Sequence, residues 1–376
     1  MARDRLRKSA GLLSLAVLLC LFRVSVAQAQ SDQSWTSSSQ QASPDGTFNP
    51  TRTSNTHTQN GNRTVDKTSV EAIGPDGRYA PYSDTETESI RVNDTTVRKV
   101  ERRFGRDSDG RRVLVQETQE ESRTLPGGEQ KVSRTTSDPD VNGNMQIVRR
   151  ELEDSKLSGP GARVTNTTVL TPDVNGGFSP AVQTEQRETR LNDGTVESRK
   201  STLLSDGTGG WKLSEVREST TRNDGTGARS IDERVSRPDS SGKLVLAEHT
   251  VEKQGPAESG EKRDTVETYS TNVPGIAGDG SLQLVRRETT VQKPGSAGGQ
   301  STTRIVQQPL PGDPTLNLHV TEEAIDIVRP GSNGKADKTS TILAPGSDGQ
   351  LRQVWVDVGK TGNPSAVQVD TSSKSK

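Results

Sequence analysis

Cysteine is nearly absent from this chain of 376 residues: Cys20 is the only one. It lies in an N-terminal segment that we expect to be removed, so the mature chain is expected to have no disulfide, no thiol nucleophile and no cysteine metal site. Many small extracellular domains depend on disulfides for stability. This chain must be stabilised in another way.

Apolar and aromatic residues are also scarce, at 27% and 3% of the chain. This composition excludes a thick hydrophobic core of the kind found in two ordinary globular domains. It also provides too few aromatic residues for the girdles of a transmembrane barrel. Charge is abundant but balanced, with 49 Lys and Arg against 50 Asp and Glu. The balanced charges produce no long-range positive electrostatic potential, which a nucleic-acid-binding protein would normally have. We therefore expect no nucleic-acid partner.

Sequence motifs for catalysis are missing. The three histidines, His57, His249 and His319, are far apart in the sequence, and no nucleotide-binding loop, dinucleotide fingerprint or nucleophile elbow occurs. An active site needs one pocket that interrupts a repeat, and no such interruption is evident. We therefore predict that the protein is not an enzyme.

The N-terminus has the three parts of a signal peptide. Basic residues including Arg3 and Lys8 precede an apolar run from Ala10 to Phe22, and Ala27-Gln28-Ala29 fits the small-x-small cleavage rule. The run has 13 residues, whereas a membrane-spanning helix needs about 20. We predict a signal peptide over residues 1–29, a mature chain that begins at Gln30, and a secreted or periplasmic protein with no membrane insertion after cleavage.

A turn ending in glycine recurs along the chain, as in Pro238-Asp239-Ser240-Ser241-Gly242. A second turn, such as Asn192-Asp193-Gly194, falls between successive copies, and its residues supply the positive φ values that tight hairpins need. Successive copies of the first turn are 31–38 residues apart, which indicates a tandem repeat of two extended segments and two turns. The closing positions are Gly46, Gly77, Gly110, Gly143, Gly176, Gly210, Gly242, Gly280, Pro314 and Gly349.

The segments between the turns have the two-residue period of β-strands. Leu244 alternates with Leu246, and Val354, Val356 and Val358 alternate in the same way. The apolar residues gather near the first turn and predict one apolar stripe there. The far ends carry adjacent Glu, Arg and Thr, so both faces are expected to be solvated at that end.

We therefore predict an all-β fold of tandem two-strand repeats of about 33 residues that form an extended antiparallel meander. A β-propeller or barrel-like closure is the alternative, and parts of the chain could be disordered. The predicted divisions are a Ser/Gln-rich segment over residues 30–43, the repeat array over residues 44–360, and a polar tail over residues 361–376.

One stretch resembles a metal-binding loop. Asp138, Asp140 and Asn142 precede Gly143 in the order found in the first half of a calcium loop, where hard oxygen atoms bind a hard cation. The twelfth position of such a loop should be Glu, but Arg149 occupies it. The same residues are those that a tight turn requires. No cofactor is expected elsewhere, and calcium is the alternative for this loop.

The repeat predicts a non-enzymatic structural or interaction scaffold with a protein or glycan partner, because equivalent units suit multivalent contact. The alternative is a carbohydrate- or ligand-binding module, and a secreted hydrolase is less favoured. Exposed terminal strands predict end-to-end self-association.

The aromatic residues that could stack on sugars, or instead fill the apolar stripe, are Trp35, Trp211, Trp355, Tyr79, Tyr82, Phe104 and Phe178.

Overall fold

The computed structural model describes residues 31–42, 48–74, 76–224, 227–256, 260–273, 280–295, 298–310, 315–331, 336–346 and 348–361. The predicted signal peptide and residues 362–376 of the predicted tail lie outside these ranges, as do the turn positions Gly46 and Pro314. Within them, no helical segment has the length and apolar character of a membrane span.

The described chain consists of twenty β-strands and one short 3₁₀ turn, η1, over Pro126–Gly128. The strands are β1 (Ser31–Ala42), β2 (Phe48–Asn60), β3 (Arg63–Ile73), β4 (Tyr79–Asn93), β5 (Thr96–Arg106), β6 (Arg112–Thr124), β7 (Gln130–Pro139), β8 (Met145–Gly159), β9 (Ala162–Pro172), β10 (Phe178–Arg190), β11 (Val196–Ser205), β12 (Trp211–Asn223), β13 (Arg229–Pro238), β14 (Leu244–Pro256), β15 (Lys262–Ser270), β16 (Gln283–Pro294), β17 (Gln300–Pro309), β18 (Leu318–Pro330), β19 (Ala336–Pro345) and β20 (Leu351–Thr361).

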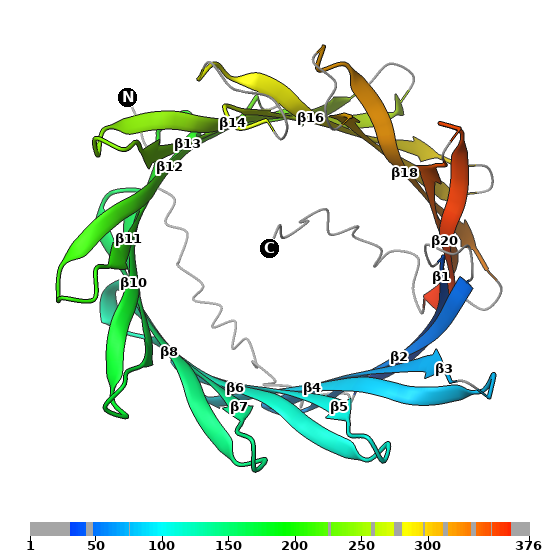
Figure 1. Cartoon of the computed structure of the whole chain (residues 1–376), viewed down its shortest axis with the longest axis horizontal. Helices are drawn as coiled ribbons and strands as arrows, with labels where there is room; N and C mark the ends of the chain where they lie inside the picture. Colours follow the sequence, from blue (N-terminus) through cyan, green and yellow to red (C-terminus); the bar gives the residue numbers. More distant parts are fainter. Residues whose placement is uncertain are drawn as a thin grey trace, which may run out of the picture.

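Each strand pairs antiparallel with the next one along the chain, so the predicted all-β meander is confirmed. The ribbon follows a ring in Figure 1, with successive hairpins side by side around it. The first strand also meets the last, because Ser37–Gln41 of β1 lie opposite Trp355–Gly359 of β20. Residues 31–42 of the predicted Ser/Gln-rich segment thus form a strand of the sheet.

The recurring turn is stabilised by the side chain of its aspartate. In the turn between β13 and β14, Asp239 Oδ1 accepts hydrogen bonds from the backbone N–H groups of Ser241 and Lys243, at 2.8 and 3.0 Å. Gly242 closes the turn with φ of 83°, a left-handed conformation that glycine adopts without strain. The same pair of side-chain hydrogen bonds occurs at Asp107, Asp140, Asp173 and Asp206.

One turn departs from the predicted position. Between β11 and β12 the left-handed residues are Gly207 and Gly209, with φ of 78° and 92°, and not Gly210. The turn therefore closes one residue earlier than the sequence spacing indicated.

A register shift follows each recurring turn from the β3–β4 hairpin onward. In the β13–β14 hairpin it lies between Val235 and Ser236, and equivalent shifts occur in all the hairpins from β3–β4 to β19–β20 that this turn joins. A β-bulge of this kind places one extra residue in one strand and turns the following side chains to the other face. The two-residue period of the sequence is therefore broken once in each unit.

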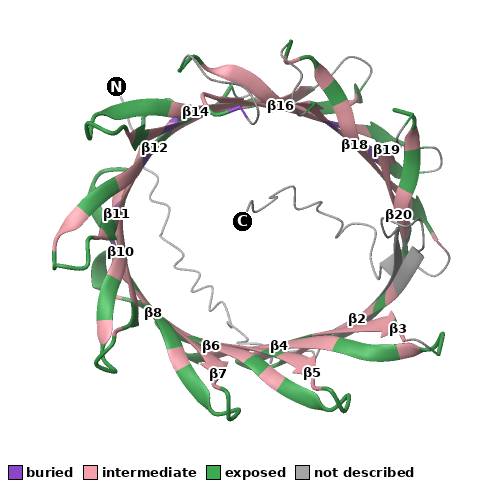
Figure 2. Ribbon diagram, viewed as in Figure 1, coloured by how far each residue is buried: buried purple, intermediate pink, exposed green. Residues whose placement is uncertain are grey.

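The hydrophobic core is thin. Among the described residues, the buried hydrophobic side chains are Val164, Val216, Val235, Val273, Val306 and Ala336. Most strand residues are half-buried and the turns are exposed (Figure 2). The expected apolar stripe is only partly buried, since Leu244 and Leu246 remain 37% and 38% exposed. A single curved sheet has no second layer to cover these side chains, so stability must come from contacts between neighbouring strands.

Candidate interaction surface

Charged residues of alternating sign cross the sheet at right angles to the strands. On one face, Lys67 of β3 lies opposite Glu86 of β4. Glu86 lies opposite Arg102 of β5, which in turn lies opposite Glu117 of β6. We call these four residues the β3–β6 ladder. Lys67 is 3.5 Å from Glu86, and Arg102 is 2.7 Å from Glu117.

A second row of this kind crosses the opposite face. Lys99 of β5 lies opposite Glu120 of β6, which lies opposite Arg134 of β7 and then Glu151 of β8. We call these four residues the β5–β8 ladder. Lys99 and Arg102 are three residues apart on β5, and side chains alternate between faces along a strand, so the two ladders lie on opposite faces.

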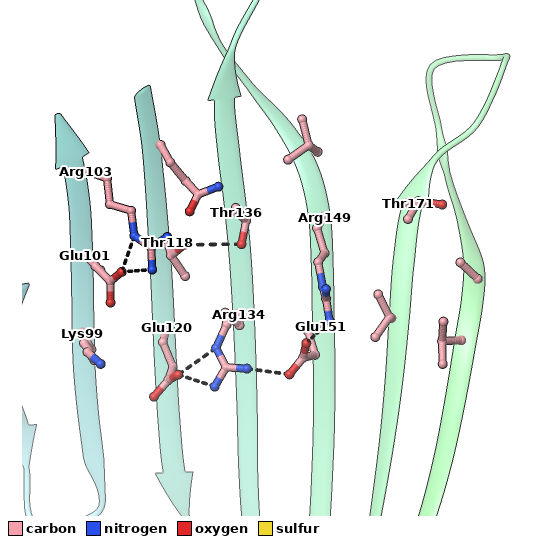
Figure 3. Close-up of a pocket in the computed structure, with 15 residues that line it drawn as sticks. Lys99, Glu101, Arg103, Thr118, Glu120, Arg134, Thr136, Arg149, Glu151 and Thr171 are labelled. Carbon is pink, nitrogen blue, oxygen red and sulfur yellow. Dashed lines mark hydrogen bonds and ion pairs between the residues drawn. The ribbon is translucent and has the colours of Figure 1, made fainter. Parts of the chain in front are cut away.

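Arg134 is the centre of the β5–β8 ladder. Its guanidinium group lies 2.6 Å from the Glu120 carboxylate on one side and 2.5 Å from Glu151 on the other (Figure 3). Arg149 contacts the second oxygen of Glu151 at 2.8 Å. The charged groups of Arg134, Glu120, Glu151 and Arg149 therefore each lie within hydrogen-bond distance of an opposite charge. Charge-assisted hydrogen bonds of this kind are the stronger ones in proteins.

The pKa values of Arg134 and Glu117 reflect this pairing. Partial burial disfavours the charged form of Arg134, but the hydrogen bond and charge of Glu120 and the charge of Glu151 outweigh it and raise the pKa. Burial likewise acts to raise the pKa of Glu117, whereas hydrogen bonds from Gln119 and Arg102 lower it, and the net pKa falls below its ordinary value. Both shifts favour the charged form, so Arg134 and Glu117 are charged at neutral pH.

The sheet is concave over the β5–β8 ladder. A hollow of about 770 Å³ is lined by side chains from β5 to β10, among them Lys99, Glu120, Arg134 and Glu151. Figure 3 shows these side chains on neighbouring strands, with dashed lines from Arg134 to Glu120 and to Glu151. The surface offers positive and negative groups at strand spacing over several strands. It can contact a polar partner at many points.

The predicted metal loop is a turn in the structure. Asp140 Oδ1 accepts the N–H groups of Asn142 and Asn144, and its Oδ2 lies 3.0 Å from the amide of Gln146. Asp138, at the end of β7, accepts a hydrogen bond from Gln116 on β6. Among the described residues, no group of three His, Cys, Asp or Glu side chains could hold a metal ion. Calcium binding at Asp138, Asp140 and Asn142 stays the alternative for this loop.

Two histidines have carboxylate partners that the sequence did not reveal. His57 Nδ1 lies 2.5 Å from Asp66, which is directly opposite it on β3. His249 Nε2 lies 3.1 Å from Asp232, and its ring stacks on Tyr269 at a centroid distance of 5.9 Å. These pairs join residues of neighbouring strands, so the strand register was needed to find them.

Several of the aromatic residues are covered by arginine. The guanidinium carbon of Arg52 lies 4.4 Å from the ring centroid of Tyr79, and Arg112 covers Phe104 at 3.3 Å. Arg150 covers Phe178 at 4.2 Å. These cation–π contacts stabilise the strand ends next to the recurring turn and occupy one face of each ring. Tyr82 differs from them, because it is 66% exposed.

Comparison with known proteins gives no family. No protein-family model matches the chain, and no curated protein matches it. The chain is similar to a bacterial polysaccharide outer membrane secretin, with 8% identity, a TM-score of 0.29, and coverage of 88% of this chain and 97% of the other. It is also similar to a BenF-like porin from Pseudomonas fluorescens Pf-5, with 9% identity, a TM-score of 0.40, and coverage of 88% and 98%. A third similar structure is Pseudomonas aeruginosa OpdK with vanillate, with 12% identity, a TM-score of 0.36, and coverage of 89% and 97%. None of these likenesses identifies a function for this chain.

Proposed function

We propose that the chain is an exported, non-enzymatic β-repeat protein that acts as a structural or interaction scaffold in the periplasm, at the cell surface or outside the cell. The observation that carries this proposal is the recurrence of paired charges on both faces of one repetitive sheet. The β3–β6 and β5–β8 ladders use equivalent strands of successive units. Repeated units of this kind offer many similar contacts, which favours multivalent binding of a protein or glycan partner.

The charges on both faces also bear on the surroundings of the sheet. Strands that contact lipid need an apolar outer face. Here the face of the β3–β6 ladder carries Glu86 and Arg102, and the other face carries Glu120 and Arg134. This arrangement supports water on both faces of the sheet and therefore a protein that is not inserted in a membrane.

Export is tested by cell fractionation and N-terminal sequencing of the full chain expressed in its own host. We expect a mature protein that begins at Gln30 in the periplasm, on the cell surface or in the medium. The variant Ala29→Arg removes the small residue at the cleavage site and should accumulate as the precursor. Wild-type protein that keeps Met1 and stays in the cytoplasm would contradict the proposal.

A carbohydrate-binding module is the second candidate, and the exposure of Tyr82 favours it. Tyr82 lines a hollow of about 640 Å³ together with Asp84, Glu101 and Arg103. An exposed ring beside polar groups suits stacking on a sugar. A glycan array with wild type, Tyr82→Ala and the control Tyr79→Ala tests this candidate, because Arg52 already covers Tyr79. Sugar binding that is lost only in Tyr82→Ala would favour the module, and an array without any sugar preference would remove it.

A further inference from the structure

The joint between β1 and β20 differs from the other joints of the ring. β1 pairs with β2 along its whole length, from Ser31↔Gln59 to Ala42↔Phe48. Among the described residues, its pairing with β20 covers Ser37–Gln41 against Trp355–Gly359. We call this five-residue joint the seam. Fewer paired residues make fewer backbone hydrogen bonds between two strands. Among the described joints, the seam therefore has the least backbone stabilisation.

The sequence of the paired segments in the seam offers no residues of opposite charge to each other. Its β1 side has the sequence Ser-Ser-Ser-Gln-Gln, and its β20 side has Trp-Val-Asp-Val-Gly, with Asp357 as the one charged residue. No opposite charge is available in this register to form an ion pair across the joint. At the β6–β7 joint, by contrast, Arg134 and Glu120 pair at 2.6 Å.

β20 presents an edge that suits a strand partner. It pairs with β19 from Leu351 to Thr361, whereas the part of β1 that the structure describes pairs with the middle of its other edge. Val354 and Val356 are half-buried, and Val358 is 56% exposed. An edge strand rich in β-branched residues is a template for pairing with another chain. β1 is a strand whose pairing register with this edge of β20 the structure already shows.

We propose that the ring opens at the seam and that β1 of one copy pairs with β20 of a second copy in the same antiparallel register. The contact joins two different edges, that of β1 and that of β20. Within one chain it closes the ring, and between chains the same contact joins copies head to tail. Within one chain the two edges have an effective concentration of about 1 mM, so joined copies should form when the protein reaches similar concentrations. This proposal goes beyond the scaffold function and does not rest on it.

Cysteine cross-linking between two chains tests the proposal directly. One full-length chain carries Ser38→Cys and the other carries Val358→Cys, since these residues lie opposite each other in the seam. Both chains carry Cys20→Ser, so each has a single thiol. Opposite residues of antiparallel strands have the Cα separation that a disulfide needs. The two chains bear different tags and are mixed at about 1 mM before mild oxidation.

The matched control is an internal joint. Chains with Thr167→Cys and Thr184→Cys, which lie opposite each other between β9 and β10, are mixed in the same way. We expect the seam mixture to give disulfide-linked heterodimer in about tenfold excess over this control, because only the seam exchanges between copies. Heterodimer at or below the control level would overturn the proposal. A Val358→Cys homodimer that exceeds the heterodimer would overturn it too, because the partner of β20 would then be another β20.

A double variant separates exchange from misfolding. Ser38→Cys and Val358→Cys in one chain should form an intramolecular disulfide that locks the ring. We expect sedimentation to show association of the wild type as concentration rises, and only monomer for the locked chain. Equal association of both would place the contact outside the seam and contradict the proposal.

Discussion

Arg134 and Glu120 lie directly opposite each other on β7 and β6, with their charged groups 2.6 Å apart. The two strands come from the same repeat hairpin, and η1 joins them. The Arg134 side chain is 37% exposed and that of Glu120 is 26% exposed. The pair is therefore screened by solvent only in part, and it fixes which residues of the two strands face each other.

A double-mutant cycle with Arg134→Gln and Glu120→Gln measures this pair. Because solvent screens the exposed part of Arg134, we expect a coupling free energy of about 0.5–1 kcal/mol. The control is the pair Arg111–Asp109, which is 3.5 Å apart with side chains 77% and 64% exposed, and its coupling should be near zero. Equal couplings in urea melts of the two cycles would contradict a stabilising role for the ladder.

The turn aspartate Asp140 predicts a loss of stability in acid. The N–H of Asn144 has the largest effect and lowers the pKa of its carboxyl group. Desolvation opposes it, and the N–H of Asn142 with the side chains of Asn144 and Gln146 keeps the net pKa below its ordinary value. A group with a lowered folded pKa contributes stability above its unfolded pKa and loses it as the pH falls through the folded value. Asp140→Ala should lower the Tm at pH 7, and the difference from wild type should shrink below pH about 4.

The control for this prediction is Asp140→Asn, which keeps a side-chain oxygen that can accept the two N–H groups. Its Tm at pH 7 should lie between those of wild type and Asp140→Ala. A difference in Tm between wild type and Asp140→Ala that stays constant from pH 7 to pH 3 would contradict the role of the Asp140 carboxylate in the turn.

Glu252 predicts the opposite pH dependence. Burial, followed by the charge of Asp264 on the neighbouring strand, raises the pKa of Glu252 against the opposing charge of Arg229. Asp264 Oδ1 is buried and has no hydrogen-bond partner among the described residues. Because the pKa of Glu252 is raised in the folded state, its ionised carboxylate destabilises the fold at neutral pH. This destabilisation disappears as the pH falls and the carboxylate is protonated.

Glu252→Gln should therefore raise the Tm at pH 7, and the gain should fade as the pH falls through the raised pKa toward 4.5, the ordinary value for Glu. The matched control is Glu117→Gln, because the pKa of Glu117 is lowered by Gln119 and Arg102 and the variant should lower the Tm at pH 7. A lower Tm for Glu252→Gln at pH 7 would count against this interpretation.

Calcium provides a separate test of the turn that contains Asp138 and Asp140. Since both carboxylates already accept hydrogen bonds within the protein, we expect the same Tm with calcium and with a chelator. If calcium instead raised the Tm and Asp138→Asn removed the increase, the segment would be a cation site as well as a turn.

The sequence predicted the elements of the fold because their signals are local. The spacing of Gly242 and its equivalents, with Asp239 at the start of the turn, identifies hairpins that depend on φ values and on hydrogen bonds within five residues. The two-residue period around Leu244 identified strands. These features hold whichever strands pair with each other.

The pairing of charges could not be read from the sequence. The bulge between Thr136 and Ser137 changes the register in the β7–β8 hairpin, and a change of one residue would move Glu151 to the other face. The burial of the apolar stripe was overestimated for a different reason. Leu244 and Leu246 alternate as core residues do, but a sheet of one layer leaves them partly exposed. The sequence pattern did not show that no second layer covers them.

Removal of single repeat units tests the scaffold proposal most directly. Deletion of residues 111–143, 144–176 or 177–209 takes out one period each and rejoins equivalent turn positions. The measurement is the fraction of each purified variant that sediments with the isolated envelope fraction of the host, after circular dichroism has confirmed a β-spectrum. A scaffold with many equivalent contacts predicts a similar partial loss of binding for each deletion. Complete loss with one deletion and none with the other two would show a single unique site and contradict the proposal.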